Sequence, residues 1–556
     1  MAIENRVTYP LDEPVDFVVV GCGSAGGILA RELSSAGFST VVLEQGPFRD
    51  SADFTHDELD VFLGNSLGGG SPETLGQTFR DDESKIAEIP FPVNPAWYAQ
   101  GVGGSSVHFT GNLWRLREID FNERSVLGSI EGTNFADWPI TYDELEPYYT
   151  RVDWEIGVSG APGPFDSPRS KPFPMPPMPI KSSGALLEKG AQAIGLHAQP
   201  APLGILSRPY NDRPPCINCG FCLGFGCEVG AKSSTLVAMI PQAIASGHCE
   251  VRPGCAVFNL ATGTNGRVSE VQYLDPDGNQ RGQKARAVVL SANGAETARL
   301  LLMSANARHP DGLANSSGFV GRNLMFNAHA GVTGVFERPL NDHKGVQVTR
   351  IVHDLYESDP KRGFYGGGGF DARPFIAATP ILYALAGQDG SKPGWGAAFK
   401  DRLAHNFTRQ MTIACNATSL PLDRNNITLD PTHKDNLGRP SLCVTYRDHD
   451  DDLANARYMQ GYAEQMMAAA GAVEQWSPPV EPTRSGPHLL GTCRMGNDPA
   501  TSVVDRYHRS HDVPNLFVCD GSSMVTSGRG QPTMTIMAMA FRAAEHIAAA
   551  ARSNAV

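Results

Sequence analysis

A glycine-rich loop between an apolar strand and a helix constrains the fold more than any other feature of this sequence. An apolar run at residues 16–20 ends in Gly21-Cys22-Gly23-Ser24-Ala25-Gly26, and residues 28–33 follow with helical periodicity. A second apolar run, residues 40–43, ends at Glu44. A strand, a loop, a helix and a second strand within about 30 residues predict a βαβ unit with parallel strands.

The spacing of the three glycines predicts a site for the pyrophosphate of a dinucleotide. Gly21 permits the tight turn, Gly23 lets the backbone approach the phosphates, and Gly26 lets helix and strand pack closely. The helix N-terminus stabilises the phosphate charge, and Glu44 accepts hydrogen bonds from the ribose hydroxyls. Glu44 suits NAD and FAD equally, but further cofactor-like segments far downstream of the loop favour FAD.

The charge of the chain argues against nucleic acid as a partner. Its 46 Lys and Arg against 59 Asp and Glu give a net charge of −13, so no basic field is available for a phosphate backbone. Residues 1–14 contain no apolar segment typical of a signal peptide, and no run of 18 apolar residues occurs. We therefore expect a cytoplasmic protein without a membrane span, with export alongside a partner subunit left open.

The rest of the chain divides into an irregular segment, several helices and a region of β-type sequence. Residues 46–100 show no sustained period and are expected to be irregular, with a lid as one interpretation. A short helix is predicted within 137–157, with Thr141 or Asp143 as its N-cap, and longer ones at 296–304, 450–472 and 532–550. An antiparallel sheet in a separate domain is predicted within 325–480, from the runs 332–336, 346–352, 426–429 and 442–446.

A set of motifs, in order along the chain, resembles one enzyme family. The motifs are Gly101-Val-Gly-Gly-Ser-Ser-Val-His108, Ser291-Ala-Asn-Gly-Ala-Glu-Thr-Ala-Arg-Leu-Leu-Leu302, His488-Leu-Leu-Gly-Thr-Cys-Arg-Met-Gly496, Asn515-Leu-Phe-Val-Cys-Asp-Gly-Ser-Ser523 and Gln531-Pro-Thr-Met-Thr-Ile536. Together with the loop at Gly21, they resemble the glucose–methanol–choline (GMC) oxidoreductases, FAD enzymes that oxidise alcohols. The motifs lie at both ends and in the middle of the chain.

The resemblance implies a fold that the residues alone do not supply. It implies an α/β protein whose Rossmann-like FAD-binding domain is built from discontinuous segments, here assigned to residues 1–160, 205–324 and 488–556. A substrate-binding domain with a mainly antiparallel sheet is expected at 325–487, with parts of 161–204.

The resemblance places the catalytic chemistry on His488 and Gln531. His488 matches the family's catalytic histidine, and imidazole, with an unperturbed pKa of about 6.5, can accept the hydroxyl proton while hydride passes to the flavin. Where the family has a second His or Asn, this chain has Gln531, which can donate a hydrogen bond to the substrate oxygen but cannot act as an acid or base. We therefore assign Gln531 a positioning role, and a two-histidine mechanism is in doubt.

Further residues are expected to contact FAD by the same resemblance. They are Ser24 and Ala25 of the first loop, Gly103, Gly104 and Ser105 of the second, His108, Val257, Asp520, Gly521, Pro532 and Thr533. His108 has the spacing of the histidine that carries a covalent flavin in some relatives, so covalent attachment is a hypothesis, with noncovalent packing on the isoalloxazine as its alternative. Pro532 and Thr533 open the last helix, whose dipole would stabilise negative charge on the reduced flavin.

Four of the eleven cysteines lie close together, namely Cys216, Cys219, Cys222 and Cys227. Their spacing nearly repeats the iron–sulfur run C-x2-C-x2-C-x3-C, and some GMC-like dehydrogenase large subunits carry such a cluster. Zinc is a second interpretation, and buried thiols or a local disulfide are a third, which we favour. We therefore commit no residue to a metal site.

The sequence thus predicts FAD-dependent oxidation of an alcohol CH–OH group, with a sugar or glycoside as the first choice of substrate. Long-chain or aromatic primary alcohols are the alternative substrates. Alternatives of another class are an NAD-linked reductase and a catalytically silent flavin-binding protein, the latter suggested by Gln531. Dioxygen, a quinone or a cytochrome subunit could each reoxidise the flavin, with a slight preference for a dehydrogenase. A homo-oligomer and a small-subunit partner are both compatible with the sequence.

Overall fold

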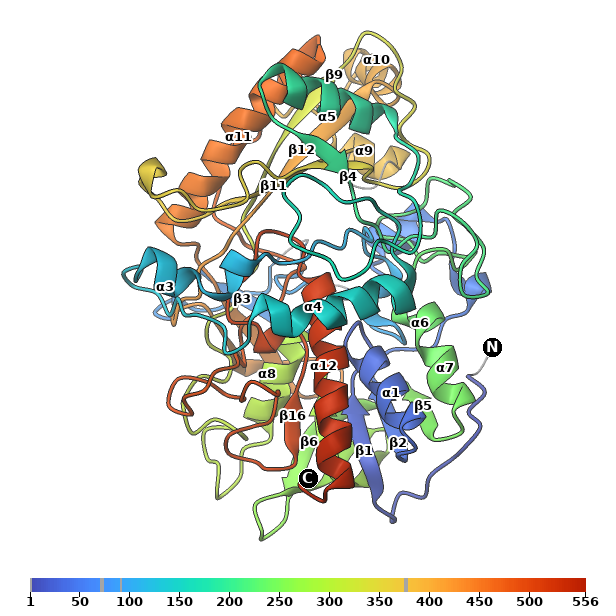
Figure 1. Cartoon of the computed structure of the whole chain (residues 1–556), viewed down its shortest axis with the longest axis vertical. Coiled ribbons are helices and arrows are strands. Elements are labelled where there is room, and N and C mark those ends of the chain that lie inside the picture. The colour runs from blue at the N-terminus through green and yellow to red at the C-terminus, as the bar shows by residue number, and fades with distance from the viewer. Residues whose placement is uncertain (1–2, 71–74, 91–92, 375–378) are drawn as a thin grey trace.

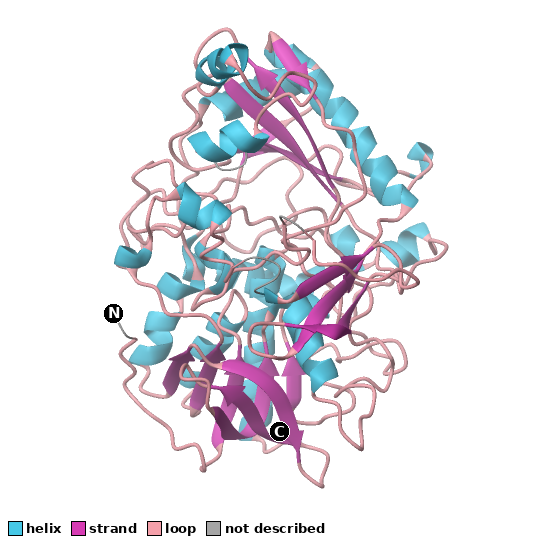
Figure 2. Cartoon of the chain, turned by 180° about the vertical axis from the view of Figure 1, so that it is seen from behind, coloured by secondary structure: helices cyan, strands magenta, loops and turns pink. Residues whose placement is uncertain are grey.

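Three β-sheets organise the computed structural model, which describes residues 3–70, 75–90, 93–374 and 379–556. A large sheet lies in the lower half of the molecule and an antiparallel sheet in the upper half (Figures 1 and 2). The third sheet is small and lies between them at mid-height (Figure 2). The α/β fold class is confirmed.

The large sheet carries the glycine-rich loop. Its strand order is β5-β2-β1-β8-β7-β6, with β16 paired to the end of β8. The strands are β1 (Val15–Val20), β2 (Thr40–Glu44), β5 (Cys249–Pro253), β6 (Ala256–Thr262), β7 (Val268–Leu274), β8 (Gln280–Leu290) and β16 (Leu516–Val518). β1 pairs in parallel with β2 and β8, and Val18, Val19 and Val42 are fully buried, as expected for central strands of a parallel sheet. The predicted βαβ unit is confirmed.

Two helices, α1 (Gly26–Ser35) and α12 (Thr533–Arg552), pack against each other in front of this sheet (Figure 1). α4 (Tyr142–Arg151) packs on α12 and begins with a capping box, in which Thr141 Oγ1 accepts from Glu144 N–H at 3.3 Å and Glu144 Oε2 from Thr141 N–H at 2.9 Å. Thr141 is therefore the N-cap. Further α-helices are α6 (Thr235–Ala238), α7 (Ile240–Ala245) and α8 (Asn293–Met303), and α3 (Glu123–Leu127) lies at mid-height (Figure 1).

The upper sheet is antiparallel throughout. Its strands, in spatial order, are β15 (Glu474–Trp476), β9 (His329–Val335), β12 (Gln410–Ala417), β11 (Gly368–Arg373), β10 (Arg350–Val352) and β4 (Ala198–Pro200). Helices α5 (Ser182–Ala193) and α11 (Asp450–Ala470) pack on it, and α9 (Pro380–Ala386) and α10 (Ala397–Asn406) lie nearby (Figure 1). The helix expected after Asp450 is confirmed, whereas the strand expected at 346–352 is reduced to β10.

The small sheet corrects two expectations. It consists of β13 (Asn426–Lys434), β14 (Pro440–Thr445) and β3 (Gln77–Arg80), with β3 parallel to β14. The runs at 426–429 and 442–446 are expected in the larger antiparallel sheet, but they pair with each other and with β3. Residues 46–100 are expected to be irregular, yet they supply β3 and the short helices Ser51–Asp53 and Leu59–Leu63. A four-residue strand whose partner is so distant in sequence leaves no local pattern to read.

The predicted domain boundaries stay a prediction. The residue spans of the two larger sheets can be compared with them. Strands of the large sheet occur between residues 15 and 518, and strands of the upper sheet between 198 and 476. Among the described helices, none is both long and apolar enough to cross a bilayer.

Candidate active site

A cavity at the carboxyl end of β1 reaches the N-terminus of α12. Parallel α/β sheets bind their ligands at this edge. Many of the residues predicted to contact the cofactor line it, namely Gly21, Gly23, Ser24, Ala25, Glu44, Gly104, Ser105, Val257, Asp520, Gly521, Pro532 and Thr533. His488 also lines the cavity, whereas Gly26, Gly103, His108 and Gln531 lie outside its lining.

The glycine-rich loop fits a dinucleotide pyrophosphate. Gly21 has φ +91°, and a Cβ there would lie 2.5 Å from the carbonyl oxygen of Ser291. A Cβ on Gly26 would collide with the carbonyl oxygen of Gly21, so Gly26 serves helix–strand packing. The nearest atom to a Cβ on Gly23 would be the Cα of Gly104, 3.9 Å away, which leaves space for a ligand against the backbone.

Glu44 fastens the loop as well as lining the cavity. Its Oε2 accepts a hydrogen bond from Cys22 N–H at 2.9 Å, and its Oε1 accepts from Gly46 N–H at 2.9 Å and Gly101 N–H at 3.2 Å. Burial raises the pKa of the Glu44 carboxyl, and these amide donors oppose that rise. Oε2 has a single amide donor and keeps the capacity to accept a ribose hydroxyl.

The second glycine-rich turn packs directly on the first. Gly103 and Gly104 have φ +95° and +52°, and a Cβ on Gly104 would lie 2.7 Å from the Cα of Gly23. Ser105 Oγ accepts a hydrogen bond from Ala99 N–H at 3.0 Å. The second turn therefore needs glycine at position 104, where its backbone meets that of Gly23.

His108 lies in a small cavity of its own that adjoins the main one at Gly104. Its Nε2 is buried and has no hydrogen-bond partner among the described residues. Burial lowers the pKa of His108 to about 4, helped by the positive charges of Lys232 and Arg49. The ring is therefore neutral at neutral pH.

Asp520 joins α8 to the turn that precedes α12. Its Oδ1 accepts from the backbone N–H and the hydroxyl of Ser522 at 2.8 and 2.5 Å, and its Oδ2 accepts from the Thr297 hydroxyl at 2.6 Å. The neighbouring Gly521 fits closely, because a Cβ there would lie 2.5 Å from the carbonyl oxygen of Leu489. Asp520 thus positions the cavity wall that follows His488.

α12 presents its N-terminus to the cavity through Pro532, Thr533 and Ile536. The first backbone amides of a helix have no partner within it, and the dipole of a 20-residue helix stabilises negative charge at this end. The position suits a ligand group that is anionic or becomes so.

His488 is held by Asn327. His488 Nδ1 lies 3.0 Å from Asn327 Oδ1, so the amide oxygen accepts the Nδ1 proton and the lone pair stays on Nε2. Asn327 is fixed in turn, since its Nδ2 donates to the carbonyl of Ala417 at 2.9 Å. Burial lowers the pKa of His488 to about 3, helped by His329 and Arg373. The imidazole is therefore neutral and able to accept a proton.

Gln531 reaches toward the antiparallel sheet. Its Nε2 donates to Asn416 Oδ1 at 3.2 Å, and Asn416 Nδ2 donates to Asp371 Oδ2 at 3.0 Å. Arg373 binds both oxygens of Asp371 at 2.6 Å. His329 is opposite Asn416 in the strand register, and its ring centre is 5.7 Å from that of His488. The two halves of the molecule thus meet at His488 and Gln531.

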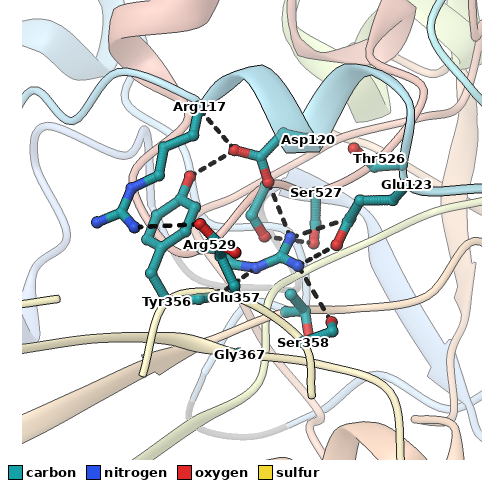
Figure 3. A network of polar contacts seen from close by, with 12 residues as sticks. Arg117, Asp120, Glu123, Tyr356, Glu357, Ser358, Gly367, Thr526, Ser527 and Arg529 are labelled. Carbon is teal, nitrogen blue, oxygen red and sulfur yellow. Dashed lines mark hydrogen bonds and ion pairs between the residues drawn. The ribbon is translucent and has the colours of Figure 1, made fainter. Parts of the chain in front are cut away.

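A buried ion cluster holds the loop that precedes Gln531 (Figure 3). Arg529 donates to Asp120 Oδ1 at 2.8 Å, to the carboxylate of Glu123, and through Nε to the carbonyl of Tyr356 at 2.6 Å. Tyr356 O–H donates to Asp120 Oδ2 at 2.6 Å, and the guanidinium of Arg117 stacks over the Tyr356 ring at 4.0 Å. The cluster ties the loop to elements of both halves.

Sequence reasoning missed this cluster and the polar residues of the upper sheet, which are Asn327, His329, Asp371, Arg373 and Asn416. The sequence did contain one signal for the strand residues. Polar residues at 371 and 373, and at 412 and 416, are two or four positions apart, and such residues lie on the same face of a strand.

The four clustered cysteines are free thiols. Burial raises the pKa of Cys216 to about 11 and also raises that of Cys222. Within the described ranges, no group of three or more His, Cys, Asp or Glu side chains is placed to hold a metal ion.

The sequence matches two family models described as GMC oxidoreductase, over residues 96–329 and 421–540. 2-Methyl-1,2-propanediol dehydrogenase from Mycolicibacterium austroafricanum is 35% identical, over 96% of this chain and 95% of that protein. The fructose dehydrogenase large subunit from Gluconobacter japonicus is 31% identical, over 96% of this chain and 97% of that protein.

Among solved structures, the fold is similar to pyridoxine 4-oxidase from Mesorbium loti. The TM-score is 0.64 at 18% identity, and the match covers 96% of this chain and 98% of that one. At this identity the likeness concerns the fold alone.

Proposed function

The chain belongs to the GMC oxidoreductases, FAD-dependent enzymes that oxidise alcohols, and we propose that its substrate is a polyol, with a sugar or glycoside as the first candidate. The observation that carries this proposal is the His488–Asn327 pair, which lies between the N-terminus of α12 and the polar residues of the upper sheet. Relatives named for a diol and for fructose support a substrate with several hydroxyls.

His488 removes the hydroxyl proton of the substrate. Because Asn327 accepts the Nδ1 proton, Nε2 carries the lone pair that takes up the proton. FAD, when bound, supplies the hydride acceptor. The imidazolium that forms keeps its hydrogen bond to Asn327, and a hydrogen bond from a charged donor is stronger than one from a neutral donor.

Gln531 orients the hydroxyl that reacts. One of its amide N–H groups is used by Asn416, so the second N–H and Oε1 remain for the substrate. Gln531 cannot exchange protons, so we assign the proton transfer to His488. The N-terminus of α12 stabilises the negative charge that arrives with the hydride.

For the attachment of FAD, we propose a covalent bond through His108. The buried Nε2, unpartnered among the described residues, and the neutral ring beside Gly104 support it. Acid precipitation separates the alternatives, because covalent flavin stays with the protein whereas noncovalent flavin enters the supernatant. His108→Ala is the matched variant, in which all flavin should become extractable.

We propose that electrons leave to a quinone or a protein partner rather than to dioxygen. Two relatives, at 35% and 31% identity, are named dehydrogenases, and the second of them is named a large subunit. We propose reduced thiols, not a cluster, at Cys216–Cys227, so these residues take no part in the transfer. Reduction of an artificial quinone should exceed oxygen consumption at least tenfold, and an equal or faster oxygen rate would contradict the proposal.

The reaction itself is tested by anaerobic titration of the flavin absorbance with polyols, sugars, and long-chain and aromatic alcohols. Bleaching by polyols supports the proposal, whereas bleaching only by the other alcohols contradicts the substrate class. A flavin that no alcohol bleaches indicates a silent flavin-binding protein, and a purified protein without flavin that consumes NADH indicates an NAD-linked reductase.

A further inference from the structure

The two faces of the upper sheet differ in character. Alternate strand residues such as Val332, Phe370 and Ile413 are fully buried in the core formed with α5 and α11. The strand register places a second set on the opposite face, namely His329, Thr333, Asp371, Arg373, Thr412 and Asn416. We call this second set the polar face.

The polar face looks toward the reacting groups. Asn416 accepts the hydrogen bond from Gln531, and the His329 and His488 rings are 5.7 Å apart. His329 is exposed, unlike His488, which is half-buried. The side chain of His329 is hydrogen-bonded to the backbone of Cys415, which leaves the other ring nitrogen for a ligand.

The charges of the polar face cancel within it. Both oxygens of Asp371 are bound by Arg373, and Oδ2 also accepts from Asn416, so the two opposite charges neutralise each other. Desolvation by the surrounding protein and the charge of Arg373 lower the pKa of His329 to about 4, although its side chain is exposed. The face therefore offers hydrogen bonds without net charge.

We propose that the polar face binds the non-reacting hydroxyls of the substrate, with His329 as a specificity-determining residue, and that the enzyme selects uncharged polyols over sugar acids and amino sugars. This inference rests on the proposed alcohol oxidation. A carboxylate or ammonium group moved to this face loses its hydration beside two charges that already neutralise each other, whereas a hydroxyl finds hydrogen-bonding partners.

Two matched substrate series test the selection on the holoenzyme. The six-carbon series is sorbitol, gluconate and glucamine, and the three-carbon series is glycerol, glycerate and 3-amino-1,2-propanediol. Within each series only the group at one end changes. Anaerobic flavin reduction should give the neutral member a kcat/KM at least tenfold above both charged members in the series that reacts better.

The outcomes separate the two proposals. An acid or amine that matches or exceeds its neutral counterpart overturns the inference. Reduction by simple monohydric alcohols but by no member of either series also overturns it, while the alcohol oxidation stands. Reduction by none of these compounds means that the proposed function has failed, and the inference fails with it.

His329→Leu tests the residue itself. We expect KM for the neutral polyol to rise at least tenfold, with kcat changed less than threefold and no change toward a monohydric alcohol. His329→Asn keeps a hydrogen-bonding group and should recover part of the loss. An unchanged KM in His329→Leu overturns the assignment.

His405→Leu is the matched control, since His405 is an exposed histidine on α10 outside the polar face. It should leave KM and kcat unaltered. Flavin content and absorbance of each variant report whether it folds, and the substrate series decides the selection even where His329→Leu does not.

Discussion

Two polar clusters flank the loop that carries Gln531, and they differ in how their charges are treated. The cluster around Arg529 is buried and charged, with Asp120 and Glu123 bound to a single guanidinium (Figure 3). The cluster around His488 contains the neutral imidazoles of His488 and His329 and several side-chain amides. The ion pair in this cluster joins Asp371 and Arg373 to each other. In the first group the carboxylates of Asp120 and Glu123 are bound by Arg529, whereas in the second group Nε2 of His488 remains for a ligand.

The difference in charge corresponds to a difference in role: the Arg529 cluster is structural, and the His488 cluster is suited to chemistry. A buried ion pair is costly to break, so the Arg529 cluster fixes the loop between Gly528 and Gln531 to both halves of the molecule. A neutral imidazole with a free lone pair can change its protonation in each turnover. The loop therefore brings a flexible amide, Gln531, to the reacting side from a rigid anchor two residues earlier.

The largest effect is expected from removing the base. His488→Ala should lower kcat by about 10²- to 10⁴-fold, because proton removal by a positioned base contributes that much. Stopped-flow flavin reduction measures this decrease in rate. Flavin content should stay unchanged, and a decrease in kcat of less than tenfold would show that another group takes the proton.

Removing the Arg529 guanidinium should lower the stability of the fold more than the rate of the reaction. Arg529→Met leaves Asp120 and Glu123 buried without their cation and should lower the free energy of unfolding by about 3–5 kcal/mol. Denaturant titration of the variant measures this. The control is Arg322→Met, an exposed arginine whose Nε donates to the Gly318 carbonyl at 2.8 Å; it should change the free energy by less than about 0.5 kcal/mol. Equal effects in both variants would remove the distinction between the clusters.

Gln531 should show an intermediate effect. Gln531→Ala removes one neutral hydrogen bond, about 1 kcal/mol, and should lower kcat/KM by about five- to tenfold. Gln531→Asn restores an amide that is one methylene shorter and should lose less. If Gln531→Ala were as slow as His488→Ala, Gln531 would have more than a positioning role.

The smallest effect concerns pH. The pKa of His488 is lowered to about 3, so the active neutral form persists as pH falls, and the acid limb of kcat/KM should lie below pH 5 rather than near 6.5. The stability of the fold depends on pH over a different range from the activity. In the unfolded chain His488 takes up a proton near pH 6.5, so its contribution to the free energy of unfolding is present above that pH and is lost progressively toward pH 3. An acid limb at 6.5 would contradict the burial of His488.

The sequence predicts those parts of the site whose residues are neighbours along the chain. The loop from Gly21 to Gly26 and the terminal Glu44 follow from a local pattern, and His488 follows from a motif resemblance. Asn327, which fixes the tautomer of His488, is 161 residues away from it. Nothing near Asn327 marks it, because its role exists only after the two halves have come together.

The same limit explains the two corrections in the fold. β3 is short and pairs with β14, so that Arg80 lies opposite Thr445. The runs at 426–429 and 442–446 are correctly predicted as strands, but a strand pattern does not name its partner. The polar face is likewise a product of register, since only strand pairing shows that His329 and Asn416 are neighbours.

The chain order of the large sheet has a consequence for biosynthesis. β1 and β2 come from the first 44 residues, β16 is at Leu516–Val518, and α12 follows at the very end. The N-terminus of a chain leaves the ribosome first. The glycine-rich loop therefore emerges hundreds of residues before His488 and the N-terminus of α12, which line the same cavity. A nascent chain therefore presents only part of this cavity until His488 and the N-terminus of α12 have emerged.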